Sequence, residues 1–267
     1  MIPKIRYANN NAHIIRVNGS NQLLVRNDES SWTPNQLGSA LGLWFDASDT
    51  GTITLNGSNV SGWNDKSGNN RHVSQAIASY QPTYQTNNLN GLAGISSAGS
   101  TIRLESASNI SWNFDIGSFA SVCSFEATNN YEALFMLDGR QSPAQFFFFR
   151  RNVSTAFGEP YRTTPISSGA TVYAGRYNRN VAVNGSTNGT YYSSALLSTF
   201  TTSSTISKLT VLGPSNPFVG AINELIVLNS YISDSDREKL EGYLAHKWGL
   251  TNNLPSNHPY KNNTPTI

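Results

Sequence analysis

The chain has 267 residues, of which 13% are charged, and a formal net charge of +2. A typical globular protein has about 25% charged residues, so uncharged amides and hydroxyls fill many polar positions here. Lys and Arg do not gather into a patch or a basic helix, which removes the electrostatic case for binding nucleic acid or an anionic membrane. Uncharged amide and hydroxyl side chains are better suited to binding sugars than to binding ions.

Cys123 is the only cysteine, which excludes a disulfide framework and a cysteine-based metal site. The alternating pattern of residues 119–125 predicts that Cys123 is a small core residue of a strand. The N-terminus lacks the apolar run of a signal peptide, and no segment reaches membrane-spanning length. We therefore expect synthesis in a cytoplasm and no membrane insertion.

Residues 1–40 differ in character from the rest and are expected to form an N-terminal anchoring arm. Two β-prone runs, 13–17 and 22–26, flank an Asn-Gly-Ser-Asn turn and predict a hairpin. Residues 27–39 are polar and are interpreted as a linker. An isolated hairpin is marginal in water, so we expect the arm to pack on its own domain or on neighbouring subunits. An extra edge hairpin of the main sheet is the alternative.

Residues 41–267 are expected to form a single domain built from many short strands. Gly and Asn turns separate strand-like runs, and no helices alternate with them, which predicts an all-β fold: a two-sheet antiparallel sandwich. The clearest runs are 41–45, 60–63, 119–125, 133–137, 145–150, 171–177, 180–183, 208–212 and 218–228.

One amphipathic helix is predicted at 234–248, directly after the last strand. Ser233 is a suitable N-cap, with Asp234 and Asp236 in the first turn. Gly249 suits the C′ position of a Schellman ending. The residues predicted to form its apolar face are Leu240, Tyr243, Leu244 and Trp248.

Several motifs occur along the chain in a fixed order. They are LWFDASD (43–49), SGWNDKSGNNRHVSQA (61–76), QPTY (81–84), VAVNG (181–185), FVGAINELIVLN (218–229), SDSDREKLEGYLAHKWGL (233–250) and LPSNHPY (254–260). This set resembles the laminin-G-like, concanavalin-A-like jelly-roll domains of phage virion and bacterial surface proteins, over about residues 40–262. The resemblance implies a jelly roll with the terminal helix packed on it, and a role in carbohydrate binding or adhesion.

Folds of this kind also include glycoside hydrolases, which act through pairs of carboxyl groups. Retaining glycosidases place two carboxyl groups about 5 Å apart, yet the sequence has no Glu-x-Asp-x-Glu run. Glu126 and Glu132 flank a predicted turn, while Glu105, Glu159 and Glu224 stand alone and are interpreted as solvated or edge carboxylates. No catalytic residue is predicted.

Calcium is the one cofactor that the resemblance suggests, because related domains hold it with Asp, Asn and backbone oxygens. Asp46, Asp49 and Asp65 are the candidate ligands. The alternative, which we favour, is that these carboxylates accept backbone N–H groups in Asx-turns. The four histidines have no metal-ligand spacing.

Sugar binding needs aromatic rings for stacking beside planar hydrogen-bonding groups. Trp44, Trp63 and Trp248 are interpreted as core residues, which leaves residues near turns. The candidate glycan ligands are Tyr131, Arg140, Tyr161, Arg162, Arg176, Tyr177 and Tyr191. Cross-strand packing is the alternative role for the tyrosines.

The sequence thus favours a non-enzymatic virion surface protein, either a tail fibre, a tail accessory or a head decoration protein. We expect a multi-copy assembly or homo-oligomer that contacts other virion subunits through residues 1–40 and a host-surface glycan through the sandwich. The alternatives are a capsid or tail component that makes only protein–protein contacts, and a glycoside hydrolase.

Overall fold

The computed structural model describes residues 14–17, 23–26, 30–99, 101–107, 110, 112–113, 116–125, 132–137, 146–147, 150–152, 155–156, 170–178, 182–187, 190–193, 205–206, 208–213 and 218–267. The strands are β1 (Ile14–Val17), β2 (Leu23–Arg26), β3 (Leu41–Asp46), β4 (Ile53–Asn56), β5 (Asn59–Trp63), β6 (Val73–Ser74), β7 (Thr83–Leu89), β8 (Leu92–Ala98), β9 (Leu104–Ser106), β10 (Trp112–Asn113), β11 (Ile116–Phe125), β12 (Glu132–Ala133), β13 (Phe135–Leu137), β14 (Phe146–Phe147), β15 (Arg150–Asn152), β16 (Thr155–Ala156), β17 (Thr171–Asn178), β18 (Ala182–Thr187), β19 (Thr190–Ser193), β20 (Thr205–Ile206), β21 (Leu209–Val211) and β22 (Val219–Leu228). The helices are α1 (Asp234–Lys247) and four short 3-10 helices, η1 (Pro34–Ala40), η2 (Thr50–Thr52), η3 (Ala78–Tyr80) and η4 (Thr251–Asn253).

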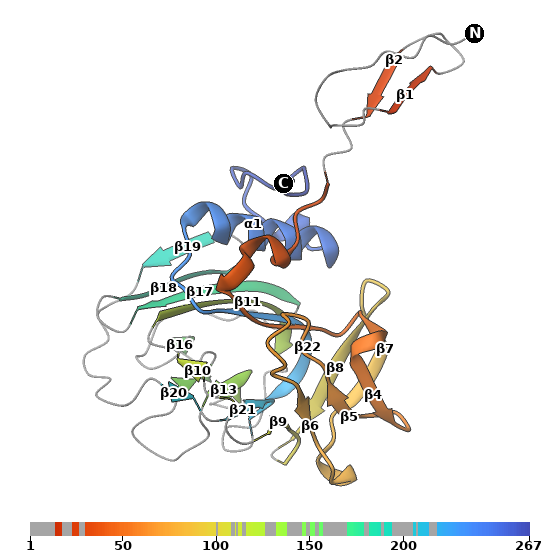
Figure 1. Cartoon of the computed structure of the whole chain (residues 1–267), viewed down its shortest axis with the longest axis vertical. Coiled ribbons are helices and arrows are strands. Elements are labelled where there is room, and N and C mark those ends of the chain that lie inside the picture. The colour runs from red at the N-terminus through yellow and green to blue at the C-terminus, as the bar shows by residue number, and fades with distance from the viewer. Residues whose placement is uncertain are drawn as a thin grey trace.

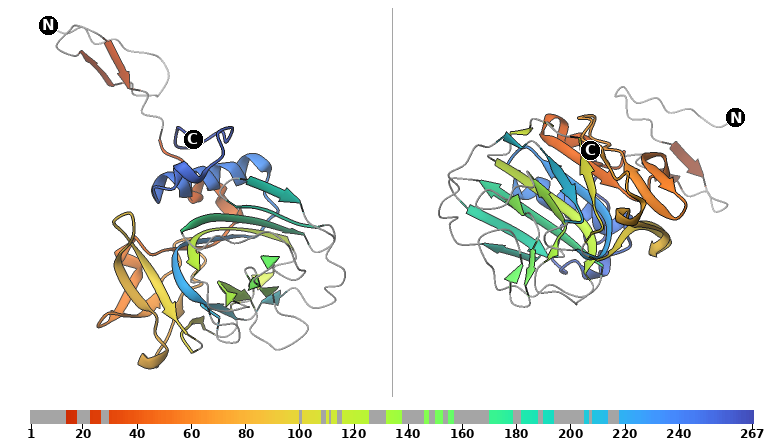
Figure 2. Two further views of the ribbon diagram at one scale, coloured as in Figure 1. Left: turned by 180° about the vertical axis from the view of Figure 1, so that it is seen from behind. Right: turned by 90° about the horizontal axis from the view of Figure 1, so that it is seen from below.

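Most of these strands belong to one curled antiparallel sheet. Its order is β14-β13-β21-β9-β6-β5-β7-β8-β22-β11-β17-β18-β19, with β3 added to β22 and β4 to β5. The sheet curls so that β11 and β17 lie beneath α1 while β13 and β21 face them from below (Figures 1 and 2). Phe119 of β11 meets Phe135 of β13 edge to face, with ring centroids 5.9 Å apart. The predicted all-β antiparallel sandwich is confirmed.

Strand β22 separates two hydrophobic cores, and every one of its residues is buried. Successive side chains of a strand point to opposite faces, so Leu225 and Val227 enter the core inside the curled sheet. Ile226 and Leu228 enter the core beneath α1. Cys123 is buried in the inner core, as its strand pattern predicted.

Helix α1 begins and ends as its sequence predicts. The Ser233 hydroxyl accepts the Asp236 N–H at 3.0 Å, and Gly249 has φ of 68°. The Leu250 N–H bonds to the Ala245 carbonyl at 2.7 Å, which is the Schellman ending. No helix among the described residues has the length and apolar character needed to cross a membrane.

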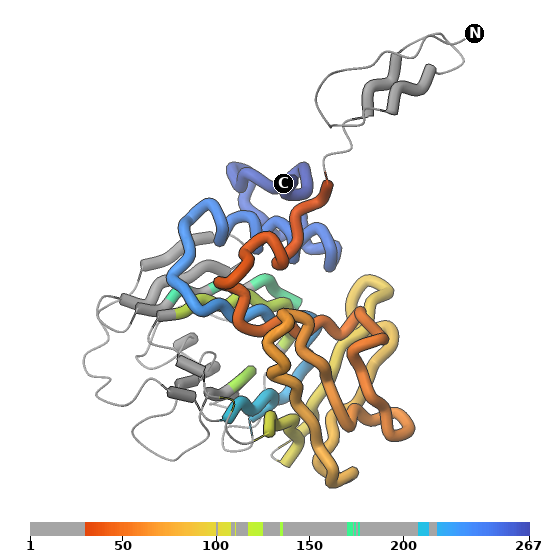
Figure 3. The backbone as a smooth tube through the Cα atoms, in the orientation of Figure 1, coloured from red at the N-terminus to blue at the C-terminus, as the bar shows by residue number. Residues whose placement is uncertain are grey.

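Residues 27–39 were interpreted as a linker, and for the described part of this stretch, residues 30–39, that interpretation is wrong. Trp32 is only 4% exposed and packs edge to face against Tyr243 of α1, with ring centroids 6.2 Å apart. Ser31 forms a backbone bridge with Thr266, so this segment lies beside the helix and the C-terminal tail (Figure 3). Burial of an indole ring is favourable enough to fix a polar stretch against the sandwich.

The predicted N-terminal hairpin is present. Strands β1 and β2 pair antiparallel from Val17 with Leu23 to Ile14 with Arg26. They form a two-stranded sheet of their own rather than an edge of the large sheet.

Candidate functional site

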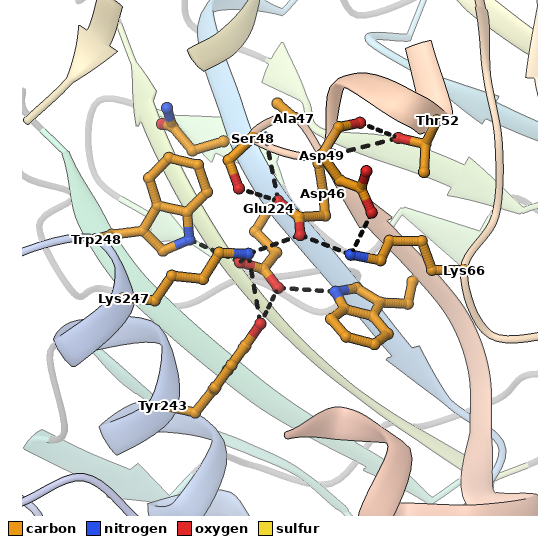
Figure 4. Close-up of polar contacts among 12 residues, drawn as sticks. Asp46, Ala47, Ser48, Asp49, Thr52, Lys66, Glu224, Tyr243, Lys247 and Trp248 are labelled. Atoms are coloured by element: carbon orange, nitrogen blue, oxygen red, sulfur yellow. Dashed lines mark hydrogen bonds and ion pairs between the residues drawn. The ribbon is translucent and has the colours of Figure 1, made fainter. Parts of the chain in front are cut away.

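Among the described residues, a group of buried carboxylates and lysines lies where β3, β22 and α1 meet. Asp46 and Glu224 stand directly opposite one another in the β3–β22 ladder, so their side chains point to the same face of the sheet. Lys247, at the end of α1, reaches down between them, and Lys66 approaches Asp46 from the loop after β5 (Figure 4). We call Asp46, Glu224, Lys66 and Lys247 the carboxylate–lysine cluster.

Glu224 is completely buried and accepts four hydrogen bonds. Its Oε1 accepts from the indole N–H of Trp44 at 2.7 Å and the hydroxyl of Tyr243 at 2.9 Å. Its Oε2 accepts from the indole N–H of Trp248 at 2.7 Å and from Lys247 Nζ at 2.6 Å. A carboxylate has about four acceptor positions, so this one is saturated. The expectation that Glu224 is a solvated or edge carboxylate is therefore wrong.

Asp46 is buried as well, at 4% exposure, and lies between two lysines. Its Oδ2 is 2.8 Å from Lys247 Nζ and 2.9 Å from Lys66 Nζ. Its Oδ1 accepts from the N–H and the hydroxyl of Ser48 at 3.1 and 2.6 Å. Burial alone would raise the pKa of Asp46, but Lys247 and the hydrogen bonds from Ser48 and Lys66 hold it below its ordinary value of 3.8.

The pKa values of the two opposed carboxyl groups are therefore shifted in opposite directions. Burial raises the pKa of Glu224, since the Lys247 ammonium opposes this only in part and the Asp46 charge adds to it. Burial and the Glu224 carboxylate also raise the pKa of the Tyr243 phenol. Divergent pKa values of neighbouring groups are typical of sites that move protons.

The cluster does not offer its carboxylates to an external substrate. All four acceptor positions of Glu224 are occupied by side chains of the same chain, and the residue has no exposed surface. A glycosidase needs a carboxyl group that can reach the leaving oxygen of its substrate. These contacts hold the C-terminal end of α1 against β3 and β22.

The predicted calcium ligands have other partners. Asp49 pairs with Lys66 at 2.8 Å. Asp65 accepts the backbone N–H groups of Trp44, Ser67 and Arg71 at 2.9, 2.9 and 3.0 Å. Asp46 and Asp65 therefore form the Asx-turn contacts of the alternative interpretation. No set of three or more His, Cys, Asp or Glu residues within the described part is arranged for a metal ion, and calcium binding stays a prediction.

Among the predicted sugar ligands, Arg176 is not at the surface. It lies in β17, is 5% exposed, and donates to the Ile232 carbonyl at 3.1 Å and to Asp234 at 2.7 Å. Burial between strand and helix start makes it a link between them. Tyr177 and Tyr191 are strand residues of β17 and β19 rather than turn residues. Tyr131, Arg140, Tyr161 and Arg162 lie outside the described residues.

Sequence reasoning missed Lys66, Lys247 and the polar roles of three aromatic residues. Tyr243 and Trp248 were interpreted as packing residues alone, and Trp44 as core. The signal that was available is Glu224 itself, because an acid within a strand that is otherwise apolar must find several donors when it is buried.

The sequence matches no protein-family model and no curated protein. Among solved structures, the ligand-binding domain of botulinum neurotoxin serotype D in complex with N-acetylneuraminic acid matches with a TM-score of 0.54, at 12% identity, over 77% of this chain and 52% of its own. The receptor-binding domain of botulinum neurotoxin D matches with a TM-score of 0.52, at 11% identity, over 74% of this chain and 51% of its own.

A mutant of Trypanosoma rangeli sialidase that displays trans-sialidase activity matches with a TM-score of 0.50, at 14% identity, over 82% of this chain and 36% of its own. The chain therefore spans about a third of the sialidase's length and about half of the toxin domain's. These likenesses show a shared β-sandwich fold.

Proposed function

We propose that the chain is a non-enzymatic, lectin-like domain of a virion surface protein and that it binds host glycans. The observation that carries the proposal is the fold: a sandwich similar to a toxin domain whose structure holds N-acetylneuraminic acid. The low charge and abundant uncharged polar residues of the sequence support it.

Sialylated glycans are the sugar class to test first. A sialic acid carries a carboxylate, and an arginine can recognise a carboxylate through two parallel hydrogen bonds. Arg140 and Arg162, both among the predicted ligands, supply such groups, and Tyr131, Tyr161 and Tyr191 supply rings that can stack on the apolar face of a sugar. Weak single sites would gain strength from the many copies on a particle.

The non-enzymatic part of the proposal is supported by the state of the opposed carboxylates. Asp46 and Glu224 are the described carboxylate pair that lies across one ladder position, and both are held by lysines. Incubation of the protein with sialyl- and neutral oligosaccharides should release no monosaccharide. Catalytic release of a monosaccharide by the purified chain would show that the domain is a hydrolase.

A glycan array probed with a multimeric form of the full chain tests the binding itself. We expect retention on sialylated glycans and loss of retention in Arg162→Ala. The matched control is Arg103→Ala, because Arg103 pairs with Glu105 at 3.3 Å and is not among the predicted ligands. Absence of binding to any glycan at millimolar subunit concentration would overturn the sugar proposal.

The virion assignment rests on the family resemblance and has its own test. We propose that residues 1–40 attach the domain to other virion subunits. Labelled antibody on intact particles should find the chain at fibre tips if it serves adhesion. A position throughout the capsid lattice would favour a purely structural role, and absence from particles would refute the assignment.

A further inference from the structure

The carboxylate–lysine cluster places an amine against two buried carboxyl groups. Lys247 Nζ lies 2.8 Å from Asp46 Oδ2 and 2.6 Å from Glu224 Oε2. Figure 4 shows the three side chains converging, with Tyr243 and Trp248 beside them. An oxygen at hydrogen-bond distance puts the carbon bonded to it near the separation of about 3–3.5 Å found in near-attack geometries.

We propose that Lys247 and Asp46 join in an intramolecular amide bond, with Glu224 as the proton carrier. The three residues supply the three parts that such a reaction needs: an amine nucleophile, a carboxyl electrophile and an acid–base group. All three are fixed by the fold in one place, which converts an unfavourable bimolecular condensation into a unimolecular step. Asp46 and Glu224 are shielded from water, so hydrolysis of the product is disfavoured.

The reaction balances without any cofactor. The Lys247 ammonium gives a proton to the Asp46 carboxylate across their hydrogen bond, and the resulting amine attacks Cγ of Asp46. Glu224, hydrogen bonded to Nζ, takes the proton that the attacking nitrogen must lose and passes it to the departing hydroxyl. The Cγ–O bond breaks, one water leaves, and Glu224 returns to its starting form.

Lys66 also contacts Asp46, but its surroundings differ. The second carboxylate beside Lys66 is Asp49, 2.8 Å from Nζ and 40% exposed. An exposed carboxylate is in contact with water, whereas Glu224 is fully buried and hydrogen bonded to Lys247 within the cluster. The geometry therefore assigns the bond to Lys247, with Lys66 holding the Asp46 carboxyl in position.

The bond would join β3, near the start of the sandwich, to the last turn of α1, near its end. A cross-link between distant positions restricts the unfolded chain and slows its opening. The chain has a single cysteine and hence no internal disulfide, so this bond would be its covalent cross-link. The inference does not depend on glycan binding.

The test is the intact mass of the purified full chain under denaturing conditions. We expect a mass lower than that of the sequence by one water, and a proteolytic peptide pair linked through Asp46 and Lys247 in tandem spectra. A mass equal to that of the sequence, or a water loss that persists in Lys247→Arg, would overturn the proposal. The second outcome would indicate dehydration at another residue.

Two further variants separate the chemistry from the fold. Asp46→Asn keeps the shape of the electrophile but has ammonia as its leaving group, so we expect the loss of one ammonia in place of one water. Lys208→Arg changes a lysine that pairs with Glu105 rather than with Asp46, and it should retain the water loss. A linked peptide pair that contains Lys66 in place of Lys247 would show that the other lysine forms the bond and would overturn the proposal.

Discussion

Glu224 of β22 faces Asp46 of β3 across the sheet ladder, and Lys247 of α1 lies between their carboxyl groups. This relationship links three segments of the sequence that are far apart in the chain. It explains why an acid is tolerated in a strand whose residues are all buried: four donors satisfy it, and two of them are indole N–H groups.

Glu224→Gln should destabilise the domain strongly. The amide would turn N–H donors toward groups that are themselves donors, and Lys247 would lose one of its two buried partners. A buried hydrogen-bond donor left without an acceptor costs about 1–3 kcal/mol, and the loss is measurable as the free energy of unfolding in urea.

Glu105→Gln is the matched control for that experiment. Glu105 pairs with Arg103 and Lys208 at 3.3 and 2.8 Å and is partly exposed. Pairs at the surface are worth about 0–1 kcal/mol, so this variant should unfold almost as the wild type does. Equal effects of the two substitutions would contradict the central role of Glu224.

Because of the Tyr243 phenol, the free energy of unfolding should depend on pH in the alkaline range. Its pKa in the folded chain is raised above 10.0 by burial and by Glu224. Below pH 10.0 the phenol is protonated in both states, and its full contribution to stability is present. As the pH rises above 10.0, the phenol ionises in the unfolded chain but not in the folded chain, so this contribution is lost. The difference in unfolding free energy between wild type and Tyr243→Phe should therefore shrink above pH 10. A difference that stays constant with pH would contradict this.

Local features of the fold could be predicted from sequence, whereas the cluster could not. The ends of α1 are set by Ser233, Asp236 and Gly249, which lie within a few residues of the groups they satisfy. The Trp44 indole and the Glu224 carboxylate are 180 positions apart and meet only through the β3–β22 register. Trp32 was missed for the same reason, since its partner Tyr243 lies at the other end of the chain.

Gly249→Ala should destabilise the C-terminal end of α1. Gly249 has φ of 68°, and an added Cβ would lie 2.7 Å from Asn90 Nδ2, which donates to the Trp248 carbonyl at 2.7 Å. The substitution combines left-handed strain of about 1–2 kcal/mol with displacement of that amide.

Gly57→Ala supplies the comparison, because Gly57 has φ of 63° with no atom within 4 Å of an added Cβ. It should show the backbone strain alone. Urea unfolding of both variants measures the difference, and a larger effect at Gly57 would contradict the proposed role of the Asn90 contact.

Two truncations should locate the start of the sandwich. Removal of residues 1–29 leaves Trp32 and η1 in place and should leave the free energy of unfolding almost unchanged. Removal of residues 1–40 deletes Trp32, and loss of a buried Trp side chain costs about 3–5 kcal/mol. Trp32→Ala in the full chain should reproduce most of that loss, whereas substitution of the exposed Ser30 by Ala should not.

Equal stability of the two truncated chains would place the boundary at residue 41 after all. If they differ as expected, the shorter truncation becomes the correct probe of assembly, because it removes the hairpin without weakening the sandwich. Failure of that variant to enter particles would then report on attachment through the arm, since a folding defect could not account for it.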